Sequence, residues 1–149
     1  TIYDPEAGFQ RQIHNIENTP FRTKFEKDLM DFHGCSGIGC ISDTDPQPLI
    51  VRSHLGLYAI TTVGIINNAE DLVKQYFSDH GHQFMAMSSG NVNATELTAA
   101  LINQKDDLVS GILHAQELKR LCNNTYTYKR RNYCRKRQNG PSACSYRSE

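Results

Sequence analysis

Ser53, His54 and Asp43 supply the three side-chain types of a nucleophile, base and orienting acid, the set that hydrolyses esters and amides. Such a triad works only when the three groups meet in space. Nothing in the spacing of these three residues requires that meeting. The sequence therefore favours a chance coincidence of residue types over a hydrolase triad.

Histidine and cysteine spacing gives little support for a metal or redox site. The pair His80 and His82 has a spacing that could hold a metal, but at the end of a predicted helix it is more typical of a solvated turn. The five cysteines form no Cys-x-x-Cys pair, and their odd number argues against a secreted disulfide framework; they are residues 35, 40, 122, 134 and 144. We expect no metal and no cofactor.

Charge is divided sharply along the chain. Residues 1–118 hold 7 basic and 15 acidic side chains, whereas residues 119–149 hold 9 basic and 1 acidic. Residues 119–149 have two interpretations. Their basic and tyrosine side chains could bind nucleic acid, or the segment could be an unstructured, solvated end of the chain. No apolar run reaches the roughly 18 residues of a membrane span, and no signal peptide opens the chain. We therefore expect a soluble cytoplasmic protein with no membrane partner.

The first half of the chain predicts mainly strands. Residues 8–16 alternate imperfectly between apolar and polar side chains, which favours a strand, and residues 36–42, 48–56 and 58–64 are short β-branched runs broken by glycine. We expect the turn between the last two at Gly56-Leu57. A helix is predicted over 21–34, with an apolar stripe at three- and four-residue spacing: Phe21, Phe25, Leu29 and Phe32.

The second half predicts three helices. One covers 67–81, with acidic residues in its first turn and a buried stripe of Leu72, Val73, Tyr76 and Phe77. The next begins at an Asn93 cap, to which Glu96 would reach back, and buries Leu97, Ala100 and Leu101. The third covers 106–118 and buries Leu108, Ile112 and Ala115. Strands followed by helices indicate an α+β domain, and the periodicity ends at Leu118.

One ordered series of segments resembles a known family. The run "GIGCISDTDPQPLIVRSHLGLYAITTVGIINNAEDL" (37–72) followed by "NVNATEL" (91–97) is similar to the glutaminase domain of amidophosphoribosyltransferase, a class II glutamine amidotransferase. The similarity covers about residues 1–118, which we take as one partial domain. It implies the N-terminal-nucleophile hydrolase fold, an αββα sandwich of two antiparallel sheets, here incomplete.

The resemblance also implies a reaction. In that family an N-terminal Cys attacks the glutamine side-chain amide with its own α-amino group as base. Backbone N–H groups and an Asn amide hold the oxyanion. The ammonia then passes to a phosphoribosyltransferase domain for purine synthesis, without a cofactor in the glutaminase step. Full-length relatives are expected to be homo-oligomers.

The family's functional positions are altered in this chain. The Arg that pairs with the glutamine carboxylate aligns with Ser42, the oxyanion Asn with Val63, and the Asp that holds the α-amino group with Ala94, whereas Gly64 remains to offer its N–H. The nucleophilic Cys has no counterpart, because Thr1 aligns inside a later strand. Thr1 could itself be a nucleophile, but we favour a truncated start.

These departures leave two interpretations. The first is a fragment of a glutamine amidotransferase that is inactive in glutamine hydrolysis. The second is a degenerate, non-catalytic domain that binds a small metabolite or a protein partner. Asp43, Asp45 and Glu96 are the candidates for recognising an amine other than glutamine.

The basic tail has an explanation that does not involve nucleic acid. The resemblance implies an apolar run and a segment like "GIIAARDxxGxxP" after residue 118, and neither occurs. If residues from Arg120 onward are written in permissible codons and read one nucleotide later, they can spell "GSATILILTKGGIIAARDKMGRLP". We therefore interpret 119–149 as a disordered tail or the product of a shifted reading frame, with no nucleic-acid partner.

Overall fold

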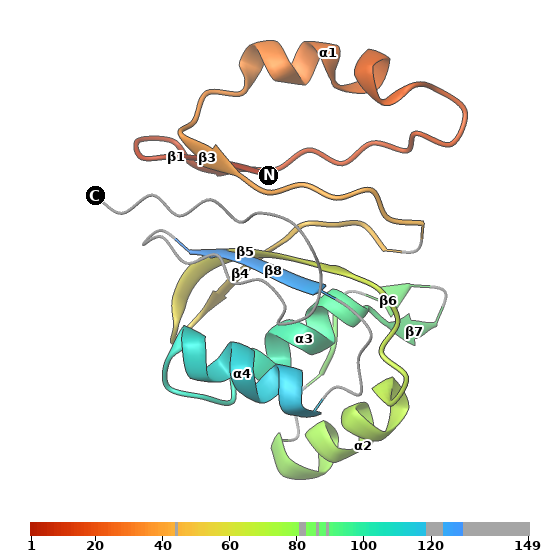
Figure 1. The fold of residues 1–149 in the computed structure, drawn as a ribbon, viewed down its shortest axis with the longest axis vertical. Coiled ribbons are helices and arrows are strands. Elements are labelled where there is room, and N and C mark those ends of the chain that lie inside the picture. The colour runs from red at the N-terminus through yellow and green to blue at the C-terminus, as the bar shows by residue number, and fades with distance from the viewer. Residues whose placement is uncertain (44, 81–82, 86, 89, 119–123, 130–149) are drawn as a thin grey trace.

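The computed structural model describes all residues except 44, 81–82, 86, 89, 119–123 and 130–149. Its elements lie in layers (Figure 1): helix α1 is outermost, followed by the sheet β2-β1-β3, the sheet β4-β5-β8 and a helical layer of α2, α3 and α4. All the strand pairings in the described residues are antiparallel. The expected α+β class is therefore confirmed.

The first sheet is small. Strands β1 (Ile2–Asp4) and β2 (Gly8–Gln10) form a hairpin, and β3 (Ser36–Gly37) pairs with the other edge of β1. Both predicted strands in this region, over 8–16 and 36–42, are much too long. The reason is that β1 has only three residues, so no partner backbone extends beyond Gln10 or Gly37.

The second sheet is built around β5 (Gly56–Val63), which pairs with β4 (Leu49–Ser53) in a hairpin. The turn residues are His54 and Leu55, so the prediction of Gly56-Leu57 is wrong by two positions. Gly56 is instead the first residue of β5 and has a φ of +96°, a conformation that glycine adopts without strain. Leu55 is buried in the core, which draws the turn inward.

Strand β8 (Asn124–Lys129) pairs with the other edge of β5. Within the predicted tail these six residues therefore form a strand, and the rest of 119–149 lies outside the described residues. The segment "NTYTYK" consists largely of β-branched and aromatic residue types, which favour extended backbone. An edge of β5 without a partner would expose unpaired N–H and C=O groups, which β8 satisfies.

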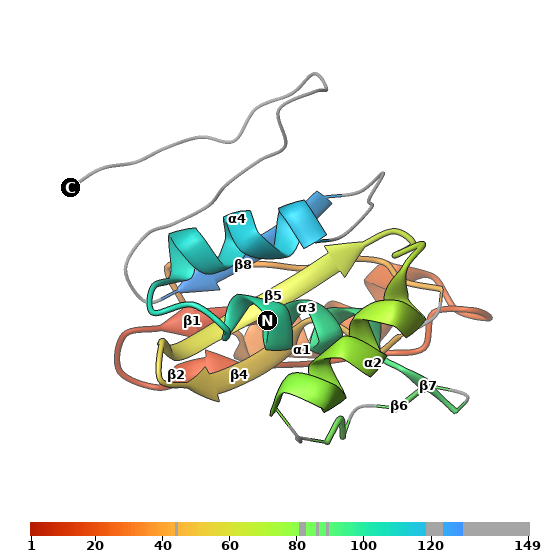
Figure 2. The same ribbon diagram turned by 90° about the horizontal axis from the view of Figure 1, so that it is seen from below.

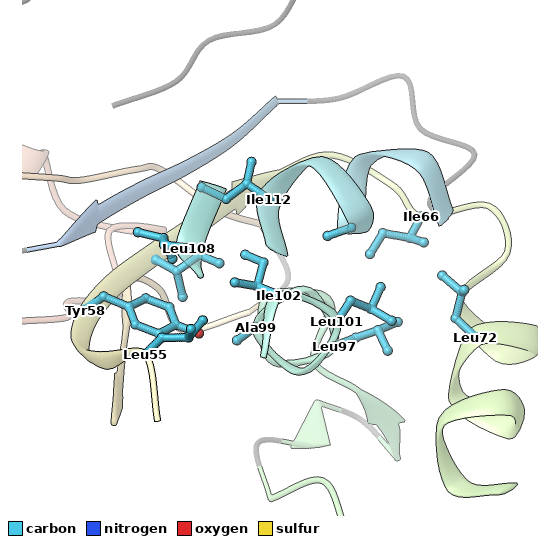
Figure 3. Packing of buried hydrophobic residues seen from close by; sticks show 12 residues of the cluster. Leu55, Tyr58, Ile66, Leu72, Leu97, Ala99, Leu101, Ile102, Leu108 and Ile112 are labelled. Carbon is cyan, nitrogen blue, oxygen red and sulfur yellow. The ribbon is translucent and has the colours of Figure 1, made fainter. Parts of the chain in front are cut away.

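The three C-terminal helices cover the second sheet on the face away from the first. They are α2 (Ala69–His80), α3 (Ala94–Ile102) and α4 (Leu108–Leu118), with a small hairpin of β6 (Met87–Ser88) and β7 (Asn91–Val92) between the first two. Helix α3 runs through the middle of the hydrophobic core (Figure 3). The core residues are Leu55, Tyr58, Ile60, Ile66, Leu72, Leu97, Ala99, Leu101, Ile102, Leu108, Ile112 and Ala115.

The Asn93 side-chain cap of α3 forms as the sequence predicts. The Asn93 side chain accepts hydrogen bonds from the backbone N–H of Thr95 at 2.8 Å and of Glu96 at 3.2 Å. The Glu96 carboxylate accepts a hydrogen bond from the N–H of Met85 at 2.9 Å. Since Met85 precedes the β6–β7 hairpin, this contact ties that segment to the first turn of α3.

The predicted buried faces are confirmed in part. Leu97 and Leu101 of α3 are buried, and so are all three residues predicted in α4, whereas Ala100 is only half-buried. In α2, Leu72 is buried but Phe77 is 45% exposed, because α2 lies at one end of the core rather than across it. Helix α1 (Phe21–Asp31) forms within the predicted 21–34, and none of its residues is buried.

No helix in the described part of the chain combines the length and apolar character needed to cross a bilayer.

Gly111 marks the closest approach of α4 to α3. A Cβ atom at this buried position would lie 2.3 Å from the Ile102 carbonyl oxygen and 3.0 Å from its Cγ2. We expect Gly111→Ala to lower the free energy of unfolding by about 1–3 kcal/mol, because the two helices must separate. Urea denaturation measures this. Gly39→Ala is the matched control, since an added Cβ there meets nothing within 4 Å; an equal loss in both variants would contradict the packing argument.

Ionisation of Tyr58 should lower the free energy of unfolding at alkaline pH. Its ring is fully buried, its hydroxyl donates to Asn103 Oδ1 at 3.1 Å, and burial raises the pKa of Tyr58 to about 12. An unfolded tyrosine has a pKa of about 10. As pH rises from 10 to 12 the unfolded state therefore loses a proton that the folded state retains, and stability falls by on the order of 2 kcal/mol. Denaturation of wild type and Tyr58→Phe across this window checks it: the variant should lack this part of the decline.

Candidate functional site

A cluster of uncharged polar side chains lies between the loop 38–48 and the C-terminal half of β5. Hydrogen bonds join its members, which come from the loop, from β5 and from the first turn of α3: Cys40, Ser42, Gln47, Thr61, Thr62 and Thr95. We call this set the threonine cluster. Its members supply hydroxyl, thiol and amide groups, so the cluster can orient a ligand but contains no carboxylate or imidazole to act as a general base.

Gln47 is the centre of the cluster. Its Oε1 accepts hydrogen bonds from the Thr61 hydroxyl and from the Thr62 backbone N–H, both at 2.8 Å. Its Nε2 contacts Ser42 Oγ at 3.5 Å. A single amide side chain thus holds the loop against β5.

Thr61 is 2% exposed, although it is a polar residue in the middle of the sandwich. Its hydroxyl oxygen lies 2.8 Å from Gln47 Oε1 and 2.9 Å from Cys40 Sγ. A hydroxyl carries one proton, and the amide oxygen can only accept it. With that proton directed to Gln47, the Cys40 thiol is left to donate to Thr61, so both side chains are satisfied without water.

Thr62 and Thr95 connect the sheet to the helical layer. Their hydroxyl oxygens are 2.6 Å apart, and Thr95 is fully buried. Neighbouring side chains on a strand point to opposite faces, so Thr61 contacts the loop while Thr62 contacts α3. The cluster therefore passes through β5 from one layer to the next.

The four positions marked by the resemblance lie around this cluster. Ser42 contacts Gln47, and Ala94 is the first residue of α3, directly before Thr95. Val63 ends β5 directly after Thr62, is 49% exposed and precedes Gly64, which is exposed and has a φ of +124°. Residues 42, 63 and 94 are far apart in sequence; Ser42 contacts Gln47 directly, and Val63 and Ala94 are the chain neighbours of Thr62 and Thr95.

Ser53, His54 and Asp43 do not form a hydrogen-bonded triad in the described part of the chain. Ser53 Oγ accepts from the Leu55 N–H at 3.2 Å, and His54 Nε2 lies 2.9 Å from the Lys105 carbonyl oxygen, to which it donates. Asp43 instead belongs to the loop 38–48, beyond the opposite end of β4. His82 lies outside the described residues, and no group of metal-binding side chains occurs among those that are described.

A cavity of about 720 Å³ opens beside the cluster, between α1 and the loop 38–48. Sequence reasoning missed it, because the spacing of the apolar residues in α1 predicts the helix but not what lies opposite its apolar face. Four of the cavity's lining residues are that stripe: Phe21, Phe25, Leu29 and Phe32. Thr1 also lines the cavity, and its hydroxyl oxygen is buried without a hydrogen-bond partner among the described residues.

Comparison with known proteins adds no assignment. No family model matches the chain, and neither a curated protein nor a solved structure matches it.

Removing the Gln47 amide should destabilise the protein. Gln47→Ala leaves the buried Thr61 hydroxyl and the Thr62 N–H without their acceptor, at a cost of about 1–3 kcal/mol in the free energy of unfolding. Chemical denaturation measures the change. Gln116→Ala, at an exposed position of α4, is the matched control and should change stability by less than about 0.5 kcal/mol. Equal stability of the two variants would show that the Gln47 contacts contribute nothing.

Proposed function

We propose that residues 1–118 are a glutamine amidotransferase-like domain with the N-terminal-nucleophile architecture, related to the glutaminase part of amidophosphoribosyltransferase. The glutamine site keeps its framework and has lost its charged contacts, so the domain does not hydrolyse glutamine. The expected compartment is the cytoplasm. The proposal is supported by the order of the layers and by the arrangement of the altered positions.

The layer order is the first support. An αββα sandwich has two antiparallel sheets face to face with helices outside both. In Figure 1 the order is α1, the sheet of β1, the sheet of β5, and then α3 and α4. The view in Figure 2 is turned by 90° and shows α3 and α2 in front of β5, in agreement with helices covering that side.

The arrangement of Ser42, Val63 and Ala94 is the observation that carries the proposal. In the family these positions contact a single glutamine, so they must be close in space. Here they are linked through Gln47 and through the 2.6 Å contact between the Thr62 and Thr95 hydroxyls. Val63 and Ala94 are the chain neighbours of Thr62 and Thr95, so this series of contacts supports the proposal that the three positions once surrounded one ligand.

The replacements explain why glutamine should bind poorly. A serine hydroxyl cannot replace the two parallel N–H donors that an Arg presents to a carboxylate. Ala94 offers no acceptor for an ammonium group, and Val63 offers no amide for the oxyanion. Loss of one oxyanion donor alone lowers the rate by about 10²- to 10³-fold.

The second interpretation, a non-catalytic binding domain, is favoured by one separate observation. The cavity beside the cluster is of the size that small ligands occupy, and it is lined mainly by apolar residues. Binding without chemistry is compatible with the altered glutamine site, since a domain can keep its sandwich after its catalytic contacts are gone.

Restoring the three contacts tests the proposal. The triple variant Ser42→Arg, Val63→Asn and Ala94→Asp should bind glutamine at least about tenfold more tightly than the unchanged chain, because a bidentate cation and a carboxylate would again hold the α-amino acid group. None of the three side chains is fully buried, so the fold should tolerate the changes. Isothermal titration with glutamine measures the affinities.

The double variant Ser42→Arg and Val63→Asn is the matched control. It lacks the carboxylate that would bind the α-amino group, so its gain in affinity for glutamine should be clearly smaller than that of the triple variant. A triple variant that is folded but binds glutamine no better than the unchanged chain would overturn the assignment.

A further inference from the structure

The cavity beside α1 has walls suited to an apolar molecule. At about 720 Å³ it lies within the range of small-molecule sites, roughly 300–1,000 Å³. One wall is the stripe of α1, in which the rings of Phe21 and Phe25 stack with centroids 4.4 Å apart. The His14 ring meets Phe25 edge-on at 4.7 Å, and Ile38 and Ile41 contribute to the opposite wall.

These walls remain partly exposed to solvent. Phe21 is 50% exposed, Leu29 60% and Ile41 67%. Exposure of several large apolar side chains around one hollow is unfavourable, and an apolar ligand would remove that surface from water. A ligand would also give α1 the buried contacts that it lacks.

The carboxylates at the cavity favour a positively charged ligand. Asp43 and Asp45 line it, and neither carboxylate has an ion-pair partner among the described residues. No Lys or Arg is among the residues that line the cavity. Arg11, which lies nearby, directs its guanidinium to the carbonyl oxygens of Pro46 and Pro48.

The other charged groups in the wall leave the cavity net negative. The Thr1 α-ammonium donates to the Ile38 carbonyl oxygen at 3.0 Å and offsets only one of the two carboxylates. The His14 ring is paired with the Asp28 carboxylate, so any positive charge on His14 is matched by a negative charge beside it. The cavity therefore presents an apolar interior with two unpaired carboxylates in the loop 38–48. Carboxylates attract ammonium groups and repel phosphate or carboxylate ligands.

We propose that this cavity binds a small apolar amine, with its aromatic or aliphatic body against Phe21, Phe25 and Ile38 and its ammonium group toward Asp43 and Asp45. The proposal goes beyond the glutamine amidotransferase assignment and does not rest on it. It uses the wall of α1 and the loop carboxylates, which are different residues from Ser42, Val63, Gly64 and Ala94, although Ser42 also lines the cavity. Failure of the glutamine experiment would therefore leave it unaffected.

Two ligands of opposite charge test whether the cavity prefers a cation, and a third ligand without an apolar body tests whether the apolar wall contributes to binding. Tryptamine and indole-3-propionate share an indole and differ in the sign of their charge, while methylammonium has the charge without the indole. Titration into the full chain at pH 7, followed by NMR shifts, should show tryptamine binding at least about tenfold more tightly than either of the other two. Equal binding of tryptamine and indole-3-propionate, equal binding of tryptamine and methylammonium, or no binding by folded protein would each overturn the proposal.

Paired variants locate the site. Asp43→Asn combined with Asp45→Asn should abolish the preference for tryptamine over indole-3-propionate. Asp79→Asn, at an exposed position of α2, removes one carboxylate far along the chain and should leave the preference unchanged. A preference that survives in the double variant, or that is lost equally in Asp79→Asn, would show that the amine binds elsewhere and would contradict the proposal.

Discussion

The Thr61 hydroxyl is the constraint on which the arrangement of the layers depends. Strand β5 is buried on both faces, and its central residues Tyr58 to Thr61 are at most 2% exposed. A hydroxyl in such a strand has no access to bulk water, and leaving it unpaired would be costly. Gln47 supplies its acceptor and at the same time accepts the Thr62 N–H. The hydrogen bonds of Gln47 therefore hold the loop 38–48 against β5.

The same constraint shapes what the site can do. The groups nearest to Ser42, Val63 and Ala94 are amides and hydroxyls that satisfy one another, and this mutual satisfaction does not need a ligand. A cluster without charged side chains can be well ordered, because its polar groups are paired within the protein. The proposed absence of glutamine hydrolysis is therefore compatible with an ordered cluster.

Helix α1 shows how a correct periodicity can leave packing undetermined. The spacing of Phe21, Phe25, Leu29 and Phe32 predicts the helix, and the helix forms. The same spacing places these side chains on one face, and that face lines a cavity. Periodicity reports which side chains share a face, but what lies opposite that face depends on segments elsewhere in the chain. Here the opposite wall is the loop 38–48, whose position depends on Gln47.

Sequence alone determined the elements whose signals are local. The Asn93 cap, the acidic first turn of α2 and the apolar spacing of α4 act within a few residues, so they specify helices without reference to the rest of the chain. Only the tertiary structure decided the short extent of β1 to β3, the turn at His54-Leu55, the pairing of β8 with β5 and the cavity beside α1. Each of these depends on which distant backbone is available as a partner, and pairing across long sequence separations leaves no local pattern to read.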